Sequence, residues 1–217
     1  MADHIITSDI GIANFLVGFR TDTLINVFSW ITLLGKSQVI SSLIAVSVVI
    51  LWLWRRYYYI LPLFIAVVGS SIFTYSGKLF FERPRPEMAV YVENSFSFPS
   101  GHASIAVAFY GLLSYLLICV AQSWITKVSL FLAGILIILA IGFSRIYLGV
   151  HYLSDVFGGY LVGAMWLIIA ISFSKWLKHT SIKDVSEPPI KSAGSISVGL
   201  IITAILFYVG FGINYHP

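Results

Sequence analysis

The feature that most constrains this chain is a series of long apolar stretches without any charged residue. Six stretches have this character, residues 38–54, 57–77, 103–122, 128–144, 156–174 and 196–213. Each is close to the ~20 residues that an α-helix needs to cross the ~30 Å hydrocarbon core of a bilayer. The apolar residues are continuous and do not alternate with polar ones, so the pattern is that of helices and not of membrane-spanning strands.

Composition supports the same assignment. Of the 217 residues, 59% are hydrophobic and only 10% are charged, whereas soluble domains carry about 25% charged residues. A water-soluble core of this size cannot hide that much apolar surface. We therefore predict an all-α, polytopic transmembrane bundle of about six spans, one for each apolar stretch.

The N-terminal part differs from the six stretches. Residues 10–34 are apolar but contain Arg20 and Asp22, and a charge at the bilayer centre costs roughly 2.5–3.5 kcal/mol. We interpret residues 1–35 as an interfacial segment, with an interfacial helix and a short helix that leads into the first span. A broken extra crossing is the alternative.

The remaining chain divides into three predicted regions. Residues 36–177 form the catalytic transmembrane core. Residues 178–195 contain Pro188, Pro189 and alternating charges, which is typical of a flexible linker, here a cytoplasmic one. Residues 196–217 contain the last span.

Three polar clusters lie at span ends on one predicted side of the membrane. The first runs from Lys78 to Arg85. A helix that continues to about Arg83 would place Lys78 and Glu82 on one face. The prolines on either side of Arg85 would then end the helix and hold this arginine in an extended chain.

The other two clusters contain the histidines. Pro99-Ser100-Gly101-His102 stands where the third span begins. Ser100 is a good N-cap residue, and the free N–H groups of a helix start form an anion site. In the last cluster, Ser144-Arg145 is followed by His151 and Asp155, whose spacing of four predicts that they lie on one helix face.

Each of these residues also has an ordinary explanation. Lys78 and Arg145 could be snorkelling anchors, and a single histidine or a Pro-Ser-Gly turn is often structural. Their joint occurrence favours function, because ionisable residues in membrane regions tend to be functional. Clustered cations with helix-start N–H groups suit an oxyanion with several oxygens, such as phosphate. A histidine backed by an aspartate suits a nucleophile or base, and a second histidine supplies an acid.

With these residues the sequence resembles the type-2 phosphatidic acid phosphatase superfamily, which includes vanadium haloperoxidases and bacterial acid phosphatases. The family signature is Lys-x6-Arg-Pro, Pro-Ser-Gly-His and Ser-Arg-x5-His-x3-Asp. The three motifs are complete and in order at residues 78–86, 99–102 and 144–155. The resemblance covers roughly residues 24–176.

The resemblance implies a role for each motif residue. His151 attacks phosphorus and forms a phosphohistidine, Asp155 orients His151, and His102 protonates the leaving oxygen and then helps to activate water. The implied phosphate-binding residues are Lys78, Arg85, Ser100, Gly101 and Arg145. The family needs no metal or other cofactor, which agrees with a sequence that has no Cys/His ligand cluster and only one cysteine, Cys119, interpreted as a small buried apolar residue.

Topology follows from the Lys and Arg residues. With six crossings, seven cations lie on one side: Arg55, Arg56, Lys127, Lys175, Lys178, Lys183 and Lys191. The other side has Arg20, Lys36, Lys78, Arg83, Arg85 and Arg145. Three of these six belong to the motifs, so they are not counted as evidence for the topology. The first side then has seven basic residues against three, and this excess places it in the cytoplasm. The motifs then face outward from a bacterial cytoplasmic membrane, the bacterial origin being inferred from small size and simple architecture.

We therefore predict a hydrolase of phosphoric monoesters or diphosphates with a membrane lipid as its substrate and no nucleic-acid partner; the oligomeric state stays open. Undecaprenyl diphosphate is favoured by its frequency in the family, ahead of phosphatidylglycerophosphate, phosphatidate and lipid A phosphate. A phosphotransferase of the same superfamily is the main alternative. A non-enzymatic descendant should have lost His102, His151 or Arg145, all of which are present, and the spans disfavour a haloperoxidase.

Three smaller expectations concern packing. Gly159 and Gly163 form a small-xxx-small pair that would let two helices approach closely. Phe96 and Phe98 are either a membrane-dipping lip or ordinary interfacial aromatics. Residues 196–213 run from inside to outside, as the first span of many family members does, and are expected to take that place in the bundle.

Overall fold

The computed structural model describes residues 2–181, which form helices and connecting loops without a β-strand. The helices are α1 (Ala2–Val17), α2 (Asp22–Leu33), α3 (Ser37–Leu53), α4 (Ile60–Phe81), α5 (Gly101–Ala106), α6 (Leu112–Val120), α7 (Trp124–Tyr147) and α8 (Leu153–Ser181). A short 3-10 turn, η1 (Tyr57–Tyr59), precedes α4, and a π-helical turn, η2 (Val107–Gly111), joins α5 to α6.

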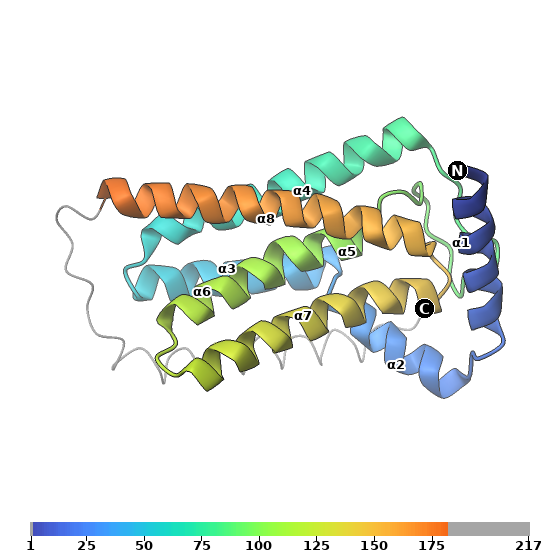
Figure 1. Ribbon diagram of the computed structural model, residues 1–217, viewed down its shortest axis with the longest axis horizontal. Helices are drawn as coiled ribbons and strands as arrows, with labels where there is room; N and C mark the ends of the chain where they lie inside the picture. The colour runs from blue at the N-terminus through green and yellow to red at the C-terminus, as the bar shows by residue number, and fades with distance from the viewer. Residues whose placement is uncertain (1, 182–217) are drawn as a thin grey trace.

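The long helices run side by side along the long axis, and α1 lies across one end of the bundle (Figure 1). Four helical segments are long and apolar enough to span a membrane: Tyr57–Phe81, Gly101–Val120, Trp124–Tyr147 and Leu153–Thr180. The pair α2 and α3, bent by 43°, is a fifth candidate. The predicted all-α membrane bundle is confirmed, with four or five candidate spans in residues 2–181. The sixth predicted span, 196–213, and its expected place lie outside the described residues.

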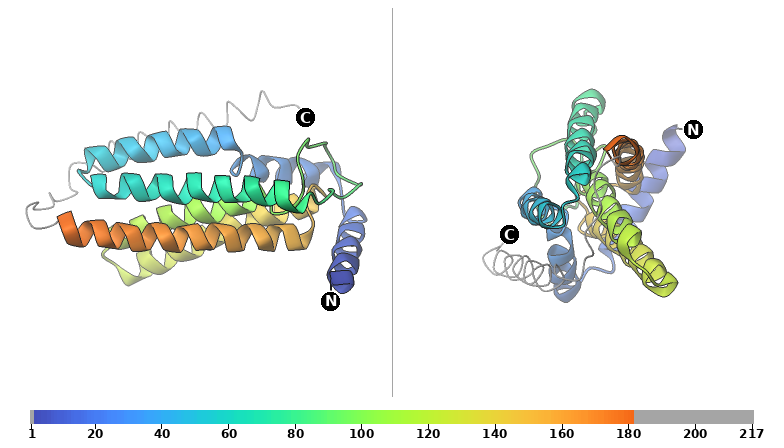
Figure 2. Two further views of the ribbon diagram at one scale, coloured as in Figure 1. Left: turned by 90° about the horizontal axis from the view of Figure 1, so that it is seen from above. Right: turned by 90° about the vertical axis from the view of Figure 1, so that its left-hand side faces the viewer.

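The N-terminal helix α1 has two different faces. Ile12 and Leu16 pack against the buried cluster that contains Ile146, while Ile10 and Phe15 are exposed. Together with its position across the end of the bundle (Figure 2), this pattern suits a helix at the membrane interface. The loop after α1 is followed by α2, a short helix that leads into α3, as the sequence suggested.

Helices α5 and α8 approach each other unusually closely, which brings two of the motifs together. A Cβ atom on Gly159 would lie 2.5 Å from the carbonyl oxygen of Ser100, and one on Gly163 would lie 2.4 Å from that of Ser104. The Ser100 N–H donates a hydrogen bond to the carbonyl oxygen of Asp155 at 2.9 Å. The small-xxx-small pair therefore fixes the start of α5 against the start of α8.

Substitution of Gly159 by alanine is expected to destabilise the protein. The new methyl group would meet a backbone carbonyl that cannot move aside, and overpacking of this kind costs about 1–3 kcal/mol. The melting temperature of the detergent-purified variant should fall. Gly11→Ala in α1, where nothing lies within 4 Å of the new Cβ, is the matched control. An equal melting temperature for both variants would show that the close helix approach contributes nothing.

Three local expectations were wrong. Helix α4 ends at Phe81, not near Arg83, and Glu82 adopts a left-handed conformation with φ of 45°. Glu82 therefore does not share a helix face with Lys78; Pro84 disfavours helical geometry at the residue before it, which promotes the early end. Cys119 is exposed, not buried, because an apolar side chain can face lipid without cost.

The start of the predicted linker also differs from expectation. Helix α8 continues to Ser181, so the first residues of the predicted linker 178–195 are helical, and the rest of it lies outside the described residues. The linker and the other predicted domain boundaries remain predictions.

Candidate active site

The three motifs meet at the end of the bundle where α1 crosses it (Figure 1). The ends of α4 and α7, the starts of α5 and α8, and the loop 82–100 all reach this end. The eight predicted site residues thus come from distant parts of the chain to one region. The structure also brings in several side chains that the sequence analysis did not select.

His151 lies in the short turn between α7 and α8, not on the helix face that its spacing suggested. Helix α8 begins only at Leu153, and the chain reverses at Gly149, whose φ of 69° favours glycine. The His151 N–H donates to the carbonyl oxygen of Arg145 at 3.3 Å. His151 is almost fully buried, so the turn holds its ring in a fixed place.

The carboxylate of Asp155 faces the Nδ1 side of this ring. Its Oδ2 lies 3.6 Å from His151 Nδ1, and the Ser97 hydroxyl lies beside the pair, donating to Asp155 Oδ2 with its oxygen 3.3 Å from Nδ1. Asp155 Oδ2 also accepts the Tyr152 N–H at 2.8 Å. A carboxylate on this side favours a proton on Nδ1 and leaves the Nε2 lone pair available.

Arg85 occupies the other side of the ring. Its Nη1 lies 3.2 Å from His151 Nε2 and donates to the Val150 carbonyl oxygen at 2.6 Å. Its Nε and Nη2 donate to the Ser95 carbonyl and hydroxyl oxygens at 2.7 and 2.9 Å. In the extended segment between Pro84 and Pro86, Arg85 is therefore aimed at the histidine.

A single carboxylate, Glu93, joins two of the cations. Its Oε2 pairs with Arg85 Nη2 at 2.7 Å and its Oε1 pairs with Arg145 Nη2. Burial alone would raise the pKa of Glu93, but the charges of Arg145 and Arg85 outweigh it and lower this pKa. Glu93 thus occupies, as an anion, the position between two guanidinium groups that suits a phosphate.

Arg145 and Lys78 complete the cationic end. Arg145 is 1% exposed, and its Nη1 donates to Thr32 Oγ1 at 2.9 Å and to the Tyr91 hydroxyl at 2.5 Å. Lys78 donates to the Phe96 carbonyl oxygen. All three cations therefore contact the segment 91–96, which covers the site.

A cavity of 480 Å³ beside this segment is lined by Tyr75, Lys78, Leu79, Arg83, Pro84, Arg85, Glu93, Asn94, Ser95 and Phe96.

The Pro-Ser-Gly-His motif forms the start of α5. Ser100 is the N-cap residue, but its buried hydroxyl does not cap the helix and has no hydrogen-bond partner within the described part of the chain. The Nε of Arg145 is likewise unpartnered there. Buried polar atoms are normally hydrogen-bonded, so both suit a ligand. The His102 ring lies against Gly35, where a Cβ would be 2.9 Å from His102 Cδ2.

The two phenylalanines before this motif have different surroundings. The Phe98 ring packs edge-to-face against Phe81 with centroids 4.9 Å apart and fills the space beside Gly158. Phe96 is more exposed, at the edge of the 480 Å³ cavity. Phe98 is thus a packing residue, and only Phe96 remains a candidate for a lip.

Four further side chains at this end, those of Glu93, Ser97, Arg83 and Asp9, were not predicted as site residues from the sequence. Arg83 pairs with both Asp155 and Asp9, at 2.7 and 2.8 Å. Asp9 carries a usable signal, since it is an acid directly before the apolar part of α1. Glu93 and Ser97 lie in an irregular loop, where spacing does not indicate which side chain faces inward.

Among residues 2–181, no three His, Cys, Asp or Glu side chains are grouped as metal ligands would be.

A helical membrane bundle that holds a His–Asp pair beside clustered cations defines a membrane-embedded phosphate-binding protein with a candidate nucleophile. The family model described as the PAP2 superfamily matches residues 57–179. The chain is 31% identical to phosphatidylglycerophosphatase B of Bacillus subtilis over 176 residues, which cover 80% of this chain and 86% of that relative. The chain belongs to the PAP2 superfamily.

Further relatives point to the same kind of enzyme. The chain is 29% identical to an undecaprenyl-diphosphatase of Sulfolobus acidocaldarius over 55% of this chain and 45% of that relative. The crystal structure of a transmembrane PAP2-type phosphatidylglycerolphosphate phosphatase from Bacillus subtilis matches with a TM-score of 0.75 and 28% identity, over 84% and 90% of the two chains. Aquifex aeolicus LpxE matches with a TM-score of 0.57 and 28% identity, over 74% and 92%. The protein is a membrane lipid phosphatase that hydrolyses phosphate esters.

Proposed function

We propose that the protein releases phosphate from a lipid phosphate through a covalent phosphohistidine on His151, without a metal ion. The observation that carries this proposal is the fixed environment of one imidazole. Asp155 stands 3.6 Å from Nδ1, and Arg85 stands 3.2 Å from Nε2. A neutral histidine held in one tautomer, with cations at its reactive nitrogen, is suited to attack phosphorus.

The proposed reaction has two steps. In the first, the His151 Nε2 lone pair forms a bond to phosphorus while the bond to the lipid oxygen breaks, and His102 gives this oxygen a proton. In the second, water attacks phosphorus, His102 takes a proton from it, and the N–P bond breaks to release phosphate and free His151. Asp155 stabilises the positive charge on the ring in both steps.

The phosphate-binding groups act by charge. Lys78, Arg85 and Arg145 would bind the equatorial oxygens, together with the Ser100 hydroxyl and the Gly101 N–H. Substrate phosphate would replace Glu93 between the two arginines, since both groups are anions with oxygens for the same donors. When phosphate replaces Glu93, Arg85 turns its N–H groups toward the phosphate and away from His151 Nε2. The lone pair of Nε2 is then free to attack.

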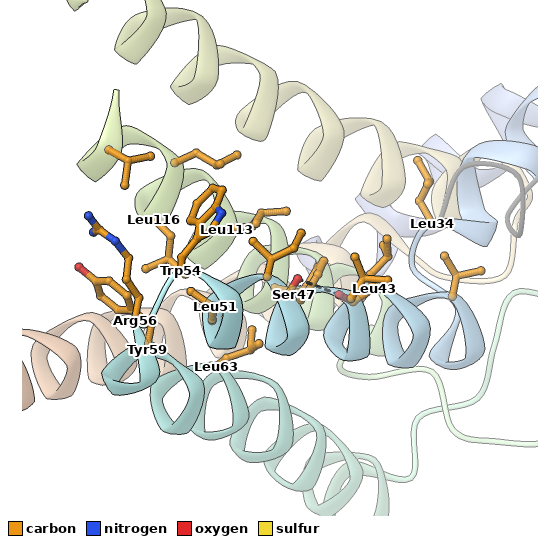
Figure 3. Close-up of a pocket in the computed structure, with 16 residues that line it drawn as sticks. Leu34, Leu43, Ser47, Leu51, Trp54, Arg56, Tyr59, Leu63, Leu113 and Leu116 are labelled. Atoms are coloured by element: carbon orange, nitrogen blue, oxygen red, sulfur yellow. Dashed lines mark hydrogen bonds between the residues drawn. The ribbon is translucent and has the colours of Figure 1, made fainter. Parts of the chain in front are cut away.

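Two cavities suggest how a lipid is accommodated. The 480 Å³ cavity brings Lys78, Arg85 and Asn94 next to the exposed Tyr75 and Leu79 of α4, and we propose that the headgroup enters there. An apolar cavity of 370 Å³ between α3, α4 and α6 extends from Leu34 to Trp54 (Figure 3). Leu34 adjoins Gly35, which contacts His102. We propose that this cavity takes part of a lipid tail.

For the substrate we propose two candidates that the assay should separate. The sequence analysis favoured undecaprenyl diphosphate, and one relative is named as an undecaprenyl-diphosphatase. The longer match to a phosphatidylglycerophosphatase supports phosphatidylglycerophosphate. Both lipids carry a second phosphate group near the one that is cleaved, which suits the cations of the headgroup cavity.

Phosphate release from a panel of lipid phosphates tests this function. The purified protein would be assayed in detergent with excess EDTA, next to His151→Ala, on undecaprenyl diphosphate, phosphatidylglycerophosphate, phosphatidate and lipid A phosphate. Release that survives EDTA and is lost in the variant supports the proposal, and the best substrate identifies the pathway step. Release only when a second lipid acceptor is added would identify a phosphotransferase. Release that needs a metal ion would refute the proposed chemistry.

The rate should persist at mildly acidic pH. Burial lowers the pKa of His151 well below its usual value of 6.5, and the charges of Arg145, Arg85 and Lys78 lower it further. Because the nucleophile must be neutral, the acid limb of kcat/KM that belongs to His151 should lie below pH 6.5, and the ring stays reactive as the pH falls through that value. A pH profile of kcat/KM checks this, and an acid limb centred above 6.5 contradicts it.

We also propose that the site faces outward from the cytoplasmic membrane. The end of α3, the start of α4 and the start of α7 lie at the opposite end of the bundle from the site (Figure 1). Arg55 and Arg56 belong to the turn between α3 and α4, and Lys127 belongs to the first turn of α7, as a basic cytoplasmic end requires. In a Cys119→Ser background, a membrane-impermeant thiol reagent applied to intact cells should label Asn94→Cys and not Gln122→Cys. The reverse labelling pattern would place the site in the cytoplasm.

A further inference from the structure

We infer that Asp9 and Arg83 are positioning residues that hold the catalytic carboxylate of Asp155, so that the N-terminal helix α1 is part of the active-site framework. The inference rests on the proposed roles of His151 and Asp155. It adds two residues that the motif signature does not specify, one of them far from every motif in the sequence.

Arg83 links two carboxylates through its planar guanidinium. Its Nη1 donates to Asp155 Oδ1 at 2.7 Å and its Nη2 donates to Asp9 Oδ2 at 2.8 Å. The guanidinium also lies over the Tyr152 ring, 4.4 Å from its centroid. These contacts fix Arg83 on three sides, and it in turn fixes the oxygen of Asp155 that faces away from His151.

Asp9 is the contribution of α1 to this group. Its side chain is 4% exposed, and its carboxylate accepts the Ser154 N–H at 3.0 Å and the Ser154 hydroxyl. Ser154 is the second residue of α8, where N–H groups have no partner within the helix. Asp9 therefore caps α8 from another helix, one residue before Asp155.

The charges explain why two aspartates are needed. Arg83 alone would neutralise Asp155 and weaken its attraction for the proton on His151. With Asp9 the charges of Asp155, Arg83 and Asp9 sum to −1, so Arg83 does not cancel the negative charge that Asp155 presents to the ring. Burial alone would lower the pKa of Arg83, but the hydrogen bond to Asp9 and the charge of Asp155 raise it, so the guanidinium stays charged.

The contacts among Asp9, Arg83 and Asp155 do more than attach the N-terminal segment to the bundle. Arg20 also ties this segment to the bundle, since it donates to the Tyr147 carbonyl at 3.0 Å and to the Met88 carbonyl at 2.6 Å. Both of these partners are backbone atoms outside the catalytic group. Arg20→Gln is therefore a matched control, because it also removes an arginine that anchors the N-terminal segment.

The experiment compares Asp9→Asn, Arg83→Gln, their double variant and Arg20→Gln in steady-state phosphate release from the best lipid. We expect kcat to fall about 10–100-fold in Arg83→Gln and less in Asp9→Asn, as for other partners that orient a catalytic group, with KM nearly unchanged. The double variant should lose clearly less than the product of the two single losses, because Asp9 and Arg83 hold the same carboxylate. Combining Arg20→Gln with Arg83→Gln should instead multiply their separate effects.

Several results would overturn the inference. One is an unchanged kcat in Asp9→Asn and Arg83→Gln, another is a rise in KM alone, and a third is a double variant whose loss is the product of the single losses. If Arg83→Gln does not fold, Arg83→Lys serves instead. A single ammonium group cannot bond both carboxylates as the two guanidinium nitrogens do, so kcat should stay low in this variant. Failure of the proposed function is seen separately, as turnover that survives His151→Ala.

Discussion

His151→Ala is expected to abolish phosphate release from every lipid substrate. The variant has no nucleophile between Asp155 and Arg85, and loss of a nucleophile typically costs about 10⁶-fold in kcat when the remaining groups cannot substitute for it. The phosphate-binding cations are untouched, so the variant should still bind substrate. Phosphate release by purified protein and lipid binding by the same sample would be measured together.

The control for this prediction is another histidine. His179 lies in the last turn of α8, exposed and at the far end of the bundle, so His179→Ala should keep full activity. Brief reaction with ³²P-labelled substrate and an alkaline quench should leave label on the wild-type chain and none on His151→Ala, since phosphoramidates resist base. Turnover by His151→Ala, or label that remains on it, would assign the nucleophile to a different residue.

The motifs allowed much of the site to be predicted, because each one couples a residue type to a span end. The cations, the histidines and Asp155 could be assigned to one membrane face from spacing and span boundaries alone, and the structure brings them to one end of the bundle. The helical architecture was equally accessible, because uncharged runs of this length have few alternatives. Substrate identity was not accessible, since no residue of the motifs distinguishes one lipid phosphate from another.

The remaining parts depend on tertiary contacts that have no local pattern. Glu93 bridges two arginines from distant segments, and Asp9 reaches α8 across 145 positions of sequence. The expected helix face for His151 failed because Gly149 turns the chain just before it. A spacing of four residues in a sequence indicates a pair but not its conformation. Here the pair forms through a turn, with the Ser97 hydroxyl in contact with both side chains.

His102→Ala is expected to slow hydrolysis of lipid phosphates by about 10²–10⁴-fold, the usual range for an acid–base residue. Without this histidine, the lipid oxygen must leave without a proton, which is unfavourable for an alkoxide. Cleavage should still pass through His151, because the contacts that Asp155 and Arg85 make with that ring do not involve His102. The variant should therefore be slow and not inactive.

The loss should depend on the leaving group, and this separates acid catalysis from a general disturbance of the site. A substituted phenolate leaves readily without protonation, so His102→Ala should lose far less activity on an aryl phosphate than on a lipid phosphate. In the wild-type protein the two substrates differ less, because His102 supplies the proton that the poorer leaving group needs. An equal loss on both would mean that His102 supports the shape of the site, through the packing of its ring against Gly35 at the junction of α2 and α3. A selective loss on the lipid substrate would assign the proton to His102, and would fix the direction in which the lipid oxygen leaves.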